Sequence, residues 1–409
     1  MKKAVMYGAG NIGRGFIGQL FSESGYEVSF IDVNMEIINR LNSEGEYPVG
    51  ILTRIGSQEI TVKNVRGVNG CDIENVVDAI ADADIMATAV GVNVLPRIAR
   101  PIAEGLKKRW QRGNMNPLNI IICENLLDAN LYLAKLIKQE LDETENKYFE
   151  NLIGLVEASI GRMVPVMTLE MQEGNVLRVF VEEYCELPVD KDGFKGEIPY
   201  VKNMQPFSPF SFFIQRKLFI HNMGHALTSY LGKMKGYTYI WEAIEDPFIK
   251  LAVLRAMQDS AKALSKEHGV NLEIILDHVD DLIYRFGNRQ LGDTIDRVGK
   301  DVKRKLSPND RLVGAANLCL AHGINPTNIC LGIASAMKFD EMSIKLKGLN
   351  DAITSDGPES VLKKICNIPE NSLLFKLALE FYSLLSDVSC INSVIEKTVE
   401  LKRRRDASQ

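Results

Sequence analysis

Residues 3–13 read KAVMYGAGNIG, and this stretch decides how the first half of the chain folds. The short apolar run predicts a buried strand, and it ends in the pattern G-x-G-x-x-G made by Gly8, Gly10 and Gly13. The segment Ile12–Ser24 that follows has the apolar spacing of a helix. In this context the first glycine permits a tight turn, the second lets a phosphate approach, and the third lets helix and strand pack. We therefore predict a dinucleotide-binding turn, with the phosphates at the helix N-terminus.

The second predicted strand, Glu27–Ile31, ends at Asp32, and an acid at this place suits the ribose hydroxyls of a dinucleotide. Its carboxylate would repel a 2′-phosphate, and Val33 and Asn34 supply no cation to hold one, so NAD is favoured over NADP. Small residues at the end of another strand-like run, before Val90 and Gly91, either let the cofactor cross the strand ends or serve packing alone. The predicted cofactor-binding residues are Gly8, Ala9, Gly10, Asn11, Ile12, Gly13, Asp32, Val90 and Gly91.

Short apolar runs alternate with helical segments through the first half of the chain, which predicts a doubly wound α/β sheet. Further strand-like runs are residues 84–90, 118–123 and 152–156. Residues 166–189 are rich in β-branched and aromatic side chains, and we expect antiparallel strands there. A region rich in proline and glycine follows, and beyond about Phe210 the pattern is almost entirely helical. We predict a Rossmann-type NAD-binding domain with added antiparallel strands at 1–195, and an all-α domain carrying the substrate and catalytic residues at 196–409.

The composition is that of a globular protein, with 409 residues, 46% hydrophobic and 25% charged, and a net charge of −5. This charge argues against a large nucleic-acid surface, and no apolar run is long enough for a transmembrane helix. Glycines and Arg14 interrupt the apolar start of the chain, so we expect this start not to be an export signal. The seven cysteines form no C-x-x-C pair and are expected to be free thiols. We therefore predict a cytoplasmic protein with a small-molecule substrate and no nucleic-acid or membrane partner.

Hydride transfer at an alcohol needs a zinc ion, a tyrosine–lysine pair, or another positioned acid or base beside the cofactor. Zinc-ligand patterns are absent from the sequence, although His221 and His225 have helical i, i+4 spacing. The remaining candidate is the segment 217–225, KLFIHNMGH, at the start of the helical region. On one helix Lys217, His221 and Asn222 lie on neighbouring turns, with His225 one turn further. From this spacing alone, a surface lysine beside a core histidine remains the alternative interpretation.

The pattern Lys-x4-Asn-x2-His in this segment resembles the signature of the polyol-specific long-chain dehydrogenases, the mannitol dehydrogenase family. The likeness extends along nearly the whole sequence. Its other matching motifs are GAGNIGRGFIG from Gly8, PLNII from Pro117, CEN from Cys123, RKLF from Arg216, GHA from Gly224, YLGK from Tyr230, RVG from Arg297, RKLS from Arg304 and DRL from Asp310.

The resemblance implies a role for each matching residue. Lys217 would be the general acid/base of a metal-independent hydride transfer, and it must then be neutral part of the time, with a pKa below the usual ~10.4. Asn125 and Asn222 would donate to the substrate oxygen, and His225 would hold the substrate hydroxyls. The predicted substrate-binding residues, Arg297 and Lys305, match family positions that contact substrate and would hold an anionic sugar.

Two positions depart from the family pattern. Gly161, just before Arg162-Met163-Val164-Pro165, stands where the family usually has an acid, and Gln215 stands where an acid is frequent. A missing carboxylate removes an acceptor for sugar hydroxyls and relieves repulsion of an anion. The departures therefore leave the identity of the sugar open, but not the chemistry.

Three hypotheses follow. The first is NAD-dependent interconversion of D-mannitol 1-phosphate and D-fructose 6-phosphate, which the resemblance within the family favours. The second keeps the chemistry but takes a hexuronate, such as fructuronate or tagaturonate. The third is a protein that senses NAD or a sugar phosphate without turnover, and the intact Lys217 argues against it. The resemblance also implies a monomer or a small homo-oligomer.

Overall fold

The computed structural model describes residues 1–165, 167–346, 353–386 and 391–406. The chain forms two compact units, Met1–Ser211 (unit 1) and Phe212–Gln409 (unit 2). The domain boundary after residue 195 stays a prediction. Six of the seven cysteines lie among the described residues and are free thiols, while Cys390 lies outside them.

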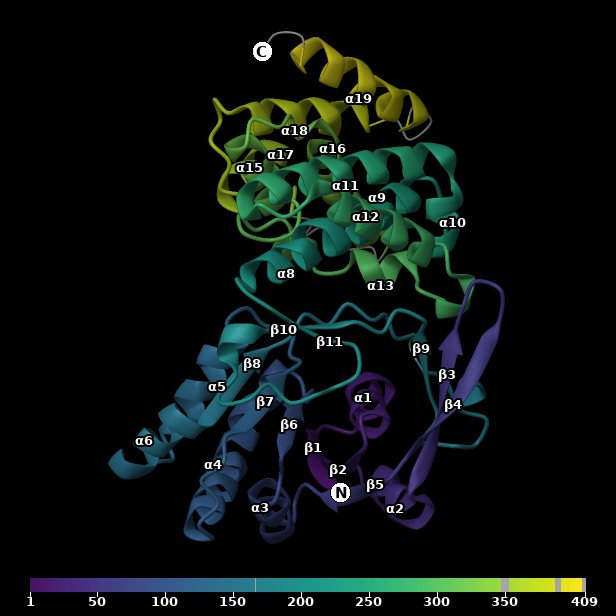
Figure 1. The fold of residues 1–409 in the computed structure, drawn as a ribbon. Helices are drawn as coiled ribbons and strands as arrows, with labels where there is room; N and C mark the ends of the chain where they lie inside the picture. The colour runs from purple at the N-terminus through teal and green to yellow at the C-terminus, as the bar shows by residue number, and fades with distance from the viewer. Residues whose placement is uncertain (166, 347–352, 387–390, 407–409) are drawn as a thin grey trace. The chain divides into compact units, whose positions relative to one another are not determined.

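Unit 1 is built around a sheet of six strands in the order β5-β2-β1-β6-β7-β8, with β1 near its middle (Figure 1). Every pairing in this sheet is parallel. The strands are β1 (Lys2–Tyr7), β2 (Tyr26–Asp32), β5 (Val65–Asn69), β6 (Ile85–Thr88), β7 (Leu118–Ile122) and β8 (Ile153–Glu157). The predicted doubly wound sheet is thus confirmed, and its order reverses at β1, where such sheets bind dinucleotides.

Both faces of this sheet are buried, which explains why its strands read as continuous apolar runs. Along β1, Ala4 and Met6 enter one hydrophobic cluster, while Val5 and Tyr7 enter the other. The first cluster is closed by a π-helical segment η1 (Gly13–Gly18), α1 (Gln19–Glu23) and α2 (Met35–Glu44). The second is closed by α3 (Ile73–Ala81), α4 (Leu95–Gln111), α5 (Ala129–Lys138) and α6 (Glu143–Leu152).

Two small sheets complete unit 1. One has the order β4-β3-β9, with β3 (Glu46–Leu52) antiparallel to β4 (Ser57–Lys63) and parallel to β9 (Val179–Glu182). The other pairs β10 (Leu187–Asp190) in parallel with β11 (Met204–Phe207). Unit 1 also contains the short helical segments η2 (Val92–Val94), α7 (Leu169–Gln172) and η3 (Lys191–Gly193).

The expectation of antiparallel strands in residues 166–189 was therefore wrong in direction. Strands β9 and β10 lie in that stretch, but β9 pairs in parallel with the distant β3, and β10 pairs in parallel with β11, the next strand in the chain. The antiparallel hairpin of unit 1 is β3–β4 instead. β-rich composition indicates a strand but not its partner, and the direction of pairing depends on which strand lies beside it.

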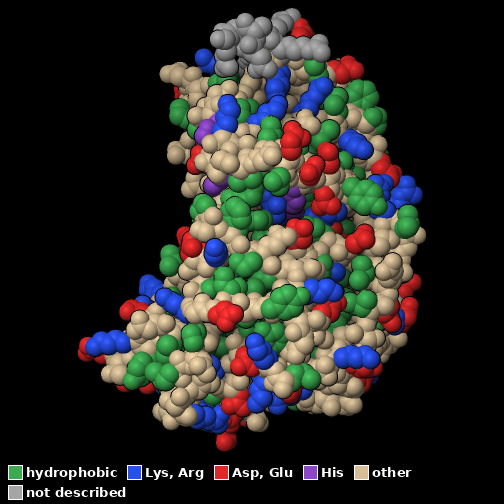
Figure 2. All heavy atoms as spheres, viewed as in Figure 1, with side chains coloured by type: hydrophobic (Ala, Val, Ile, Leu, Met, Phe, Trp, Pro, Cys, Tyr) green, Lys and Arg blue, Asp and Glu red, His purple; other side chains and the backbone are tan. Residues whose placement is uncertain are grey.

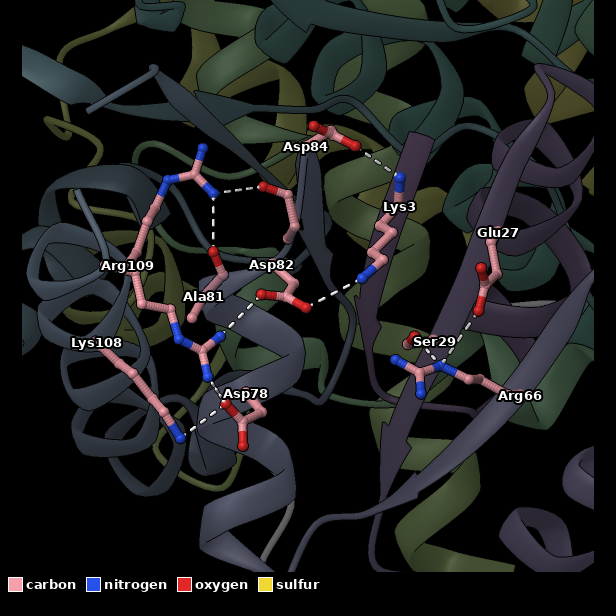
Figure 3. A network of polar contacts seen from close by, with 12 residues as sticks. Lys3, Glu27, Ser29, Arg66, Asp78, Ala81, Asp82, Asp84, Lys108 and Arg109 are labelled. Carbon is pink, nitrogen blue, oxygen red and sulfur yellow. Dashed lines mark hydrogen bonds and ion pairs between the residues drawn. The ribbon is translucent and has the colours of Figure 1, made fainter. Parts of the chain in front are cut away.

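A network of charged residues joins the elements at the amino-terminal edge of the sheet (Figure 3). The backbone N–H of Lys3 donates to Asp84 at 2.7 Å, and its ammonium donates to Asp82 at 3.0 Å. The buried Arg109 donates to the carbonyls of Ala81 and Ala83 at 3.1 and 2.7 Å. These bonds tie β1 to the chain around α3 and α4. The carboxyl-terminal edge, where ligands bind in such sheets, is a separate place.

The described residues of unit 2 form helices (Figure 1), which confirms the predicted helical pattern beyond about Phe210, while strand β11, inside the predicted range 196–409, belongs to unit 1. Their bounds are α8 (Ser211–Arg216), the π-helical η4 (Lys217–Asn222), α9 (Met223–Met234), α10 (Ile240–Glu245), α11 (Pro247–His268), α12 (Leu272–Phe286), η5 (Arg289–Leu291), α13 (Ile295–Gly299), α14 (Val302–Lys305), α15 (Val313–Ala321), α16 (Thr327–Leu346), α17 (Pro358–Lys364), α18 (Leu373–Leu384) and α19 (Ile391–Asp406).

The lengths of the helices and the side chains on one face of the molecule bear on possible membrane or nucleic-acid contacts. Among the described residues, every helix is too short or too polar to cross a bilayer. Figure 2 shows basic and acidic side chains interspersed over the face in view, as the small net charge of −5 leads one to expect.

Candidate active site

The three glycines of the turn after β1 meet three different steric demands. Gly8 has φ +104°, and a Cβ there would lie 2.5 Å from the carbonyl oxygen of Ala89. A Cβ on Gly13 would lie 2.0 Å from the carbonyl oxygen of Gly8, so only glycine lets the helix pack this closely on the turn. A Cβ on Gly10 would meet nothing within 4 Å. The backbone at Gly10 therefore faces open space, as close approach of a ligand requires.

The peptide of Ala9, between the first two glycines, is held from both sides. Its N–H donates to Oδ2 of Asp32 at 2.7 Å, and its carbonyl accepts from Nε of Arg14 at 2.7 Å. The other Asp32 oxygen, Oδ1, accepts the N–H of Asn34 at 2.9 Å. Asp32 thus fixes the shape of the turn and, with its remaining lone pairs, can still accept from ribose hydroxyls.

Arg14 is a positioning residue that the sequence analysis did not single out. It is 3% exposed, and besides Ala9 its guanidinium binds the carbonyl of Val176 at 3.0 Å. Burial lowers the pKa of Arg14, while the nearby Tyr47 and Asp32 act in the opposite direction. Its carbonyl in turn accepts the Tyr47 hydroxyl at 2.7 Å. The sequence signal for this role was an arginine on the apolar face of the predicted helix, in its first turn.

A second carboxylate holds the loop after β6. The side chain of Glu124, 8% exposed, accepts the N–H of Val90 on one oxygen and the N–H of Gly91 on the other, each at 2.9 Å. Gly91 has φ +90°, which is accessible to glycine at little cost. Glu124 therefore positions the predicted cofactor residues Val90 and Gly91. Sequence reasoning missed this role of Glu124. Asn125, the predicted donor, follows Glu124 directly and is exposed.

These features of unit 1 suit a dinucleotide. The first turn of a helix has N–H groups without partners in the helix, and here that turn starts beside Asn11 and Ile12, both half-buried. The open backbone at Gly10 gives a pyrophosphate access to them. The carboxylate of Asp32 stands at the end of β2, where the ribose of a dinucleotide binds.

In unit 2 the predicted catalytic segment is π-helical from Lys217 to Asn222. In an α-helix, residues five apart point about 140° away from one another. The i→i+5 hydrogen bonding of a π-helix places such residues more nearly above one another, and π-bulges are frequent at functional sites. The structure thus brings Lys217 and Asn222 toward the same side, and both are half-buried. Sequence analysis did not foresee this wider turn.

Basic side chains lie around the buried ring of His221. Burial is the main cause that lowers the pKa of His221 well below its usual value, and the charges of Arg285, His225, His278 and Lys217 lower it further. His221 is therefore neutral at physiological pH. Its ring lies 6.1 Å from that of His225, and both contact Phe286, on which His225 stacks at 4.8 Å.

The structure joins His225 to Arg297 through Asp293, a residue that the sequence analysis missed. Nε2 of His225 lies 3.1 Å from Oδ2 of Asp293, and Nε of Arg297 donates to Oδ1 at 2.6 Å. Oδ2 of Asp293 lies off the line of a straight hydrogen bond from Nε2 of His225, so the carboxylate acts on the ring through its own charge. Burial alone would raise the pKa of Asp293, but the contacts with His225 and Arg297 hold it below its usual value.

Helix α13 packs on one face of α9, and this packing sets the distance between His225 and Asp293. Ser229 donates to the carbonyl of Ile295 at 2.8 Å, and Lys233 pairs with Asp296 at 2.7 Å. A Cβ on Gly232 would lie 2.6 Å from Cδ1 of Ile295, so the glycine of the YLGK motif permits the close approach. The short α13 is thus fixed on the same helix that carries His225.

The two predicted substrate residues have different surroundings. The Arg297 side chain is 46% exposed, as an anion contact requires. Lys305 is 5% exposed, and its ammonium donates to the carbonyl of Val298. Burial first, and then the charges of Arg311 and Arg304, lower the pKa of Lys305 to about 7.

The two departures from the family pattern have identifiable neighbours. A Cβ on Gly161 would lie 3.3 Å from the ring of Tyr184, whose hydroxyl donates to Glu186 at 3.2 Å. Gln215, through Oε1, lies 3.0 Å from Nε2 of His268. Among the described residues, no group of three or more His, Cys, Asp or Glu side chains could hold a metal ion.

Comparison with known proteins covers most of the chain. Two family models match it, the mannitol dehydrogenase Rossmann domain over residues 2–203 and the mannitol dehydrogenase C-terminal domain over residues 210–376. The fold resembles that of a D-sorbitol dehydrogenase in substrate-free form, with TM-score 0.79 and 15% identity over 96% of this chain and 95% of that one. It also resembles Pseudomonas fluorescens mannitol 2-dehydrogenase in complex with NAD and D-mannitol, with TM-score 0.72 and 14% identity over 98% and 94%.

Replacing Asp32 by alanine should weaken dinucleotide binding by about 10-fold or more, because charge-assisted bonds to the turn and the ribose are lost together. The preference for NADH over NADPH should also fall. Calorimetric titration of both nucleotides measures this, with Asp82→Ala at the opposite edge as the matched control. An unchanged preference would mean that Asp32 does not face the ribose.

Lys305 should make the stability of unit 2 depend on pH. Its folded pKa of about 7 lies below the value in the unfolded chain, so between pH 7 and ~10.4 the unfolded state binds the extra proton and stability rises with pH. Relative to Lys305→Met, the wild type should gain about 2 kcal/mol between pH 6 and pH 9. Urea unfolding followed by Trp241 in a Trp110→Phe background reports on unit 2. The exposed Lys300→Met is the control, and a flat difference for Lys305→Met contradicts the prediction.

Proposed function

Because this chain belongs to the mannitol dehydrogenase family, we propose that it is an NAD-dependent mannitol-1-phosphate 5-dehydrogenase, which interconverts D-mannitol 1-phosphate and D-fructose 6-phosphate. The coarser statement, an NAD-dependent polyol dehydrogenase, follows from the family. The choice of a phosphorylated sugar is the proposal.

The glycine turn and Asp32 would hold the cofactor. The N–H groups around Gly10 and Asn11 bind the pyrophosphate, and the Asp32 carboxylate accepts from the adenosine ribose. Asp32 and Arg14 keep the turn in shape through Ala9, and Glu124 keeps Val90 and Gly91 in place. When bound, NAD accepts the hydride in oxidation and returns it in reduction.

Side chains of the enzyme transfer the proton, stabilise the charge on the reacting oxygen and orient the substrate. In oxidation, neutral Lys217 takes the proton of the reacting hydroxyl, and in reduction it returns that proton to the carbonyl oxygen. Asn125 and Asn222 donate to the same oxygen and stabilise its developing negative charge. His225 orients the neighbouring hydroxyls. The π-helical turn supports this assignment, since it brings Lys217 and Asn222 toward one side.

One observation carries the choice of an anionic sugar: the half-exposed guanidinium of Arg297 is linked to His225 through a single carboxylate. An arginine in this position can bind a phosphate with two parallel hydrogen bonds. The neutral residues Gly161 and Gln215, at places where the family usually or frequently has acids, leave fewer negative charges to repel such a group.

A hexuronate such as fructuronate or tagaturonate is the second candidate, because a carboxylate is also an anion that arginine binds. The observation that favours it is the Tyr184–Glu186 pair beside Gly161, which offers hydroxyl contacts different from those of an acid at position 161. For either substrate we further propose a cytoplasmic protein that is a monomer or a small homo-oligomer.

The direct test is NADH oxidation with fructose 6-phosphate, fructose, fructuronate and tagaturonate in parallel. We expect kcat/KM for fructose 6-phosphate to exceed that for fructose by about 10- to 100-fold, the worth of charge-assisted bonds to a phosphate. Turnover with a uronate alone would reassign the substrate and keep the cofactor site. Binding of NADH without turnover of any of the four sugars would favour a sensor.

Replacing Lys217 by alanine should lower kcat by about 10²- to 10⁴-fold, because the proton then lacks a positioned acceptor. The Kd for NADH should be nearly unchanged. Stopped-flow and steady-state assays measure the first, and calorimetry the second. The exposed Lys250→Ala on α11 is the control and should behave as wild type. Near-full activity of Lys217→Ala would show that another group moves the proton.

A further inference from the structure

The carboxylate of Asp293 is placed to serve two residues of the site at once. Asp293 lies between η5 and α13, and its side chain is 10% exposed. Its backbone is fixed on both sides, because its carbonyl accepts the N–H of Ile240 at 2.9 Å and Gly292 before it turns with φ +57°. Such a carboxylate has little freedom to turn toward other partners.

Its two oxygens have different partners. Oδ2 lies 3.1 Å from Nε2 of His225, and Oδ1 accepts from Nε of Arg297 at 2.6 Å and also contacts Nη2. Among the described residues, Asp293 is the one carboxylate within 4 Å of either partner. A change at Asp293 therefore reaches both residues together.

For His225 the contact selects a tautomer. An ionised carboxylate beside Nε2 favours the proton on that nitrogen, so in the neutral ring Nδ1 carries the lone pair. Stacking on Phe286, at 4.8 Å and 15°, fixes the plane of the ring. His225 then presents an acceptor, which suits a hydroxyl that donates.

The contact with Asp293 determines which edge of the Arg297 guanidinium stays available to a ligand. Asp293 occupies the Nε side of the guanidinium, while the backbone N–H of Arg297 donates to the Thr294 hydroxyl at 3.3 Å. The edge formed by Nη1 and the outer N–H of Nη2 is left for another oxyanion. That edge has the fork geometry that binds phosphate or carboxylate with two bonds.

We propose that Asp293 is the positioning residue of this site: it holds the proton of His225 on Nε2, so that Nδ1 accepts from a substrate hydroxyl, and it turns the outer edge of Arg297 toward the anionic group of the same substrate. The proposal rests on the proposed function for the identity of the substrate, but not for the two contacts. It links recognition of the anion and orientation of the hydroxyls through one buried carboxylate.

The first experiment needs no turnover. In the full-length protein labelled with ¹⁵N-histidine, nitrogen shifts report which ring nitrogen of each of the five histidines carries the proton, and His225→Gln assigns the His225 signals. We expect wild-type His225 to be protonated on Nε2. In Asp293→Asn the amide oxygen should face the two N–H groups of Arg297, and its NH₂ should face His225, so the proton should move to Nδ1. A wild-type proton on Nδ1, or no change in Asp293→Asn, overturns the proposal.

The second experiment is kinetic. Asp293→Asn should lower kcat by about 10- to 100-fold, as loss of such a supporting contact does elsewhere, while the Kd for NADH stays unchanged. Asp280→Asn is the matched control, since Asp280 is an exposed acid on α12, and it should keep wild-type kinetics. Equal kinetics for the two variants would overturn the role of Asp293.

Arg297→Gln separates the two halves of the proposal and serves if Asp293→Asn does not fold. It should raise KM for fructose 6-phosphate by about 10-fold or more, with little effect on KM for fructose, and leave the His225 tautomer as in wild type. A changed tautomer would show that Asp293 alone does not hold the ring. If wild type turns over no sugar phosphate but His225 keeps its Nε2 proton, the substrate assignment fails and the positioning role stands.

Discussion

The packing of Gly13 against the carbonyl of Gly8 is the constraint on which the cofactor half of the molecule depends. Any side chain at position 13 would place Cβ at 2.0 Å from that oxygen, well inside contact distance. Because the two backbones touch, the following helix starts directly above the end of β1. Arg14 is thereby brought to the Ala9 carbonyl, and Asp32, at the end of the neighbouring strand, to the Ala9 N–H. One steric fact thus places a turn, a helix and a carboxylate together.

In unit 2, another glycine permits a similarly close contact between two elements. Gly232 lets Ile295 approach α9 so closely that α13 lies on the helix that carries His225. The short α13 begins just after Asp293, so this packing brings a buried acid to the histidine and an arginine to the acid. The π-helical turn before α9 adds Lys217 and Asn222 on one side. In both units, carboxylates hold polar groups in place: Asp32 and Glu124 bind backbone N–H groups, and Asp293 binds side chains.

The sequence was sufficient where a pattern is local. Apolar runs and the glycine turn predicted the parallel sheet, because strands buried on both faces need such runs. It was insufficient where the partner is distant or is backbone. Glu124 binds two N–H groups more than thirty residues away, and Asp293 reaches His225 from the segment between η5 and α13, so neither has a spacing that a motif could show. The parallel pairing of β9 with the distant β3 was missed for the same reason. The wide turn at Lys217 was missed because the apolar spacing of the segment reads as an ordinary helix. Lys305 was expected as an anion contact, and its site role stays a prediction, while its burial against Val298 could not be foreseen from a basic segment.

The balance of charge supports the proposal that this chain takes an anionic substrate. An acid at position 161 would crowd the ring of Tyr184, and an acid at position 215 would face His268 and favour its charged form. With glycine and glutamine there, both carboxylates are absent, while Arg297 keeps a half-exposed guanidinium. Asp293 neutralises part of that charge but occupies only one edge of it. Under the proposed function, a phosphate or carboxylate would bind the outer edge of Arg297 with two hydrogen bonds, whereas a neutral sugar would leave that edge to water.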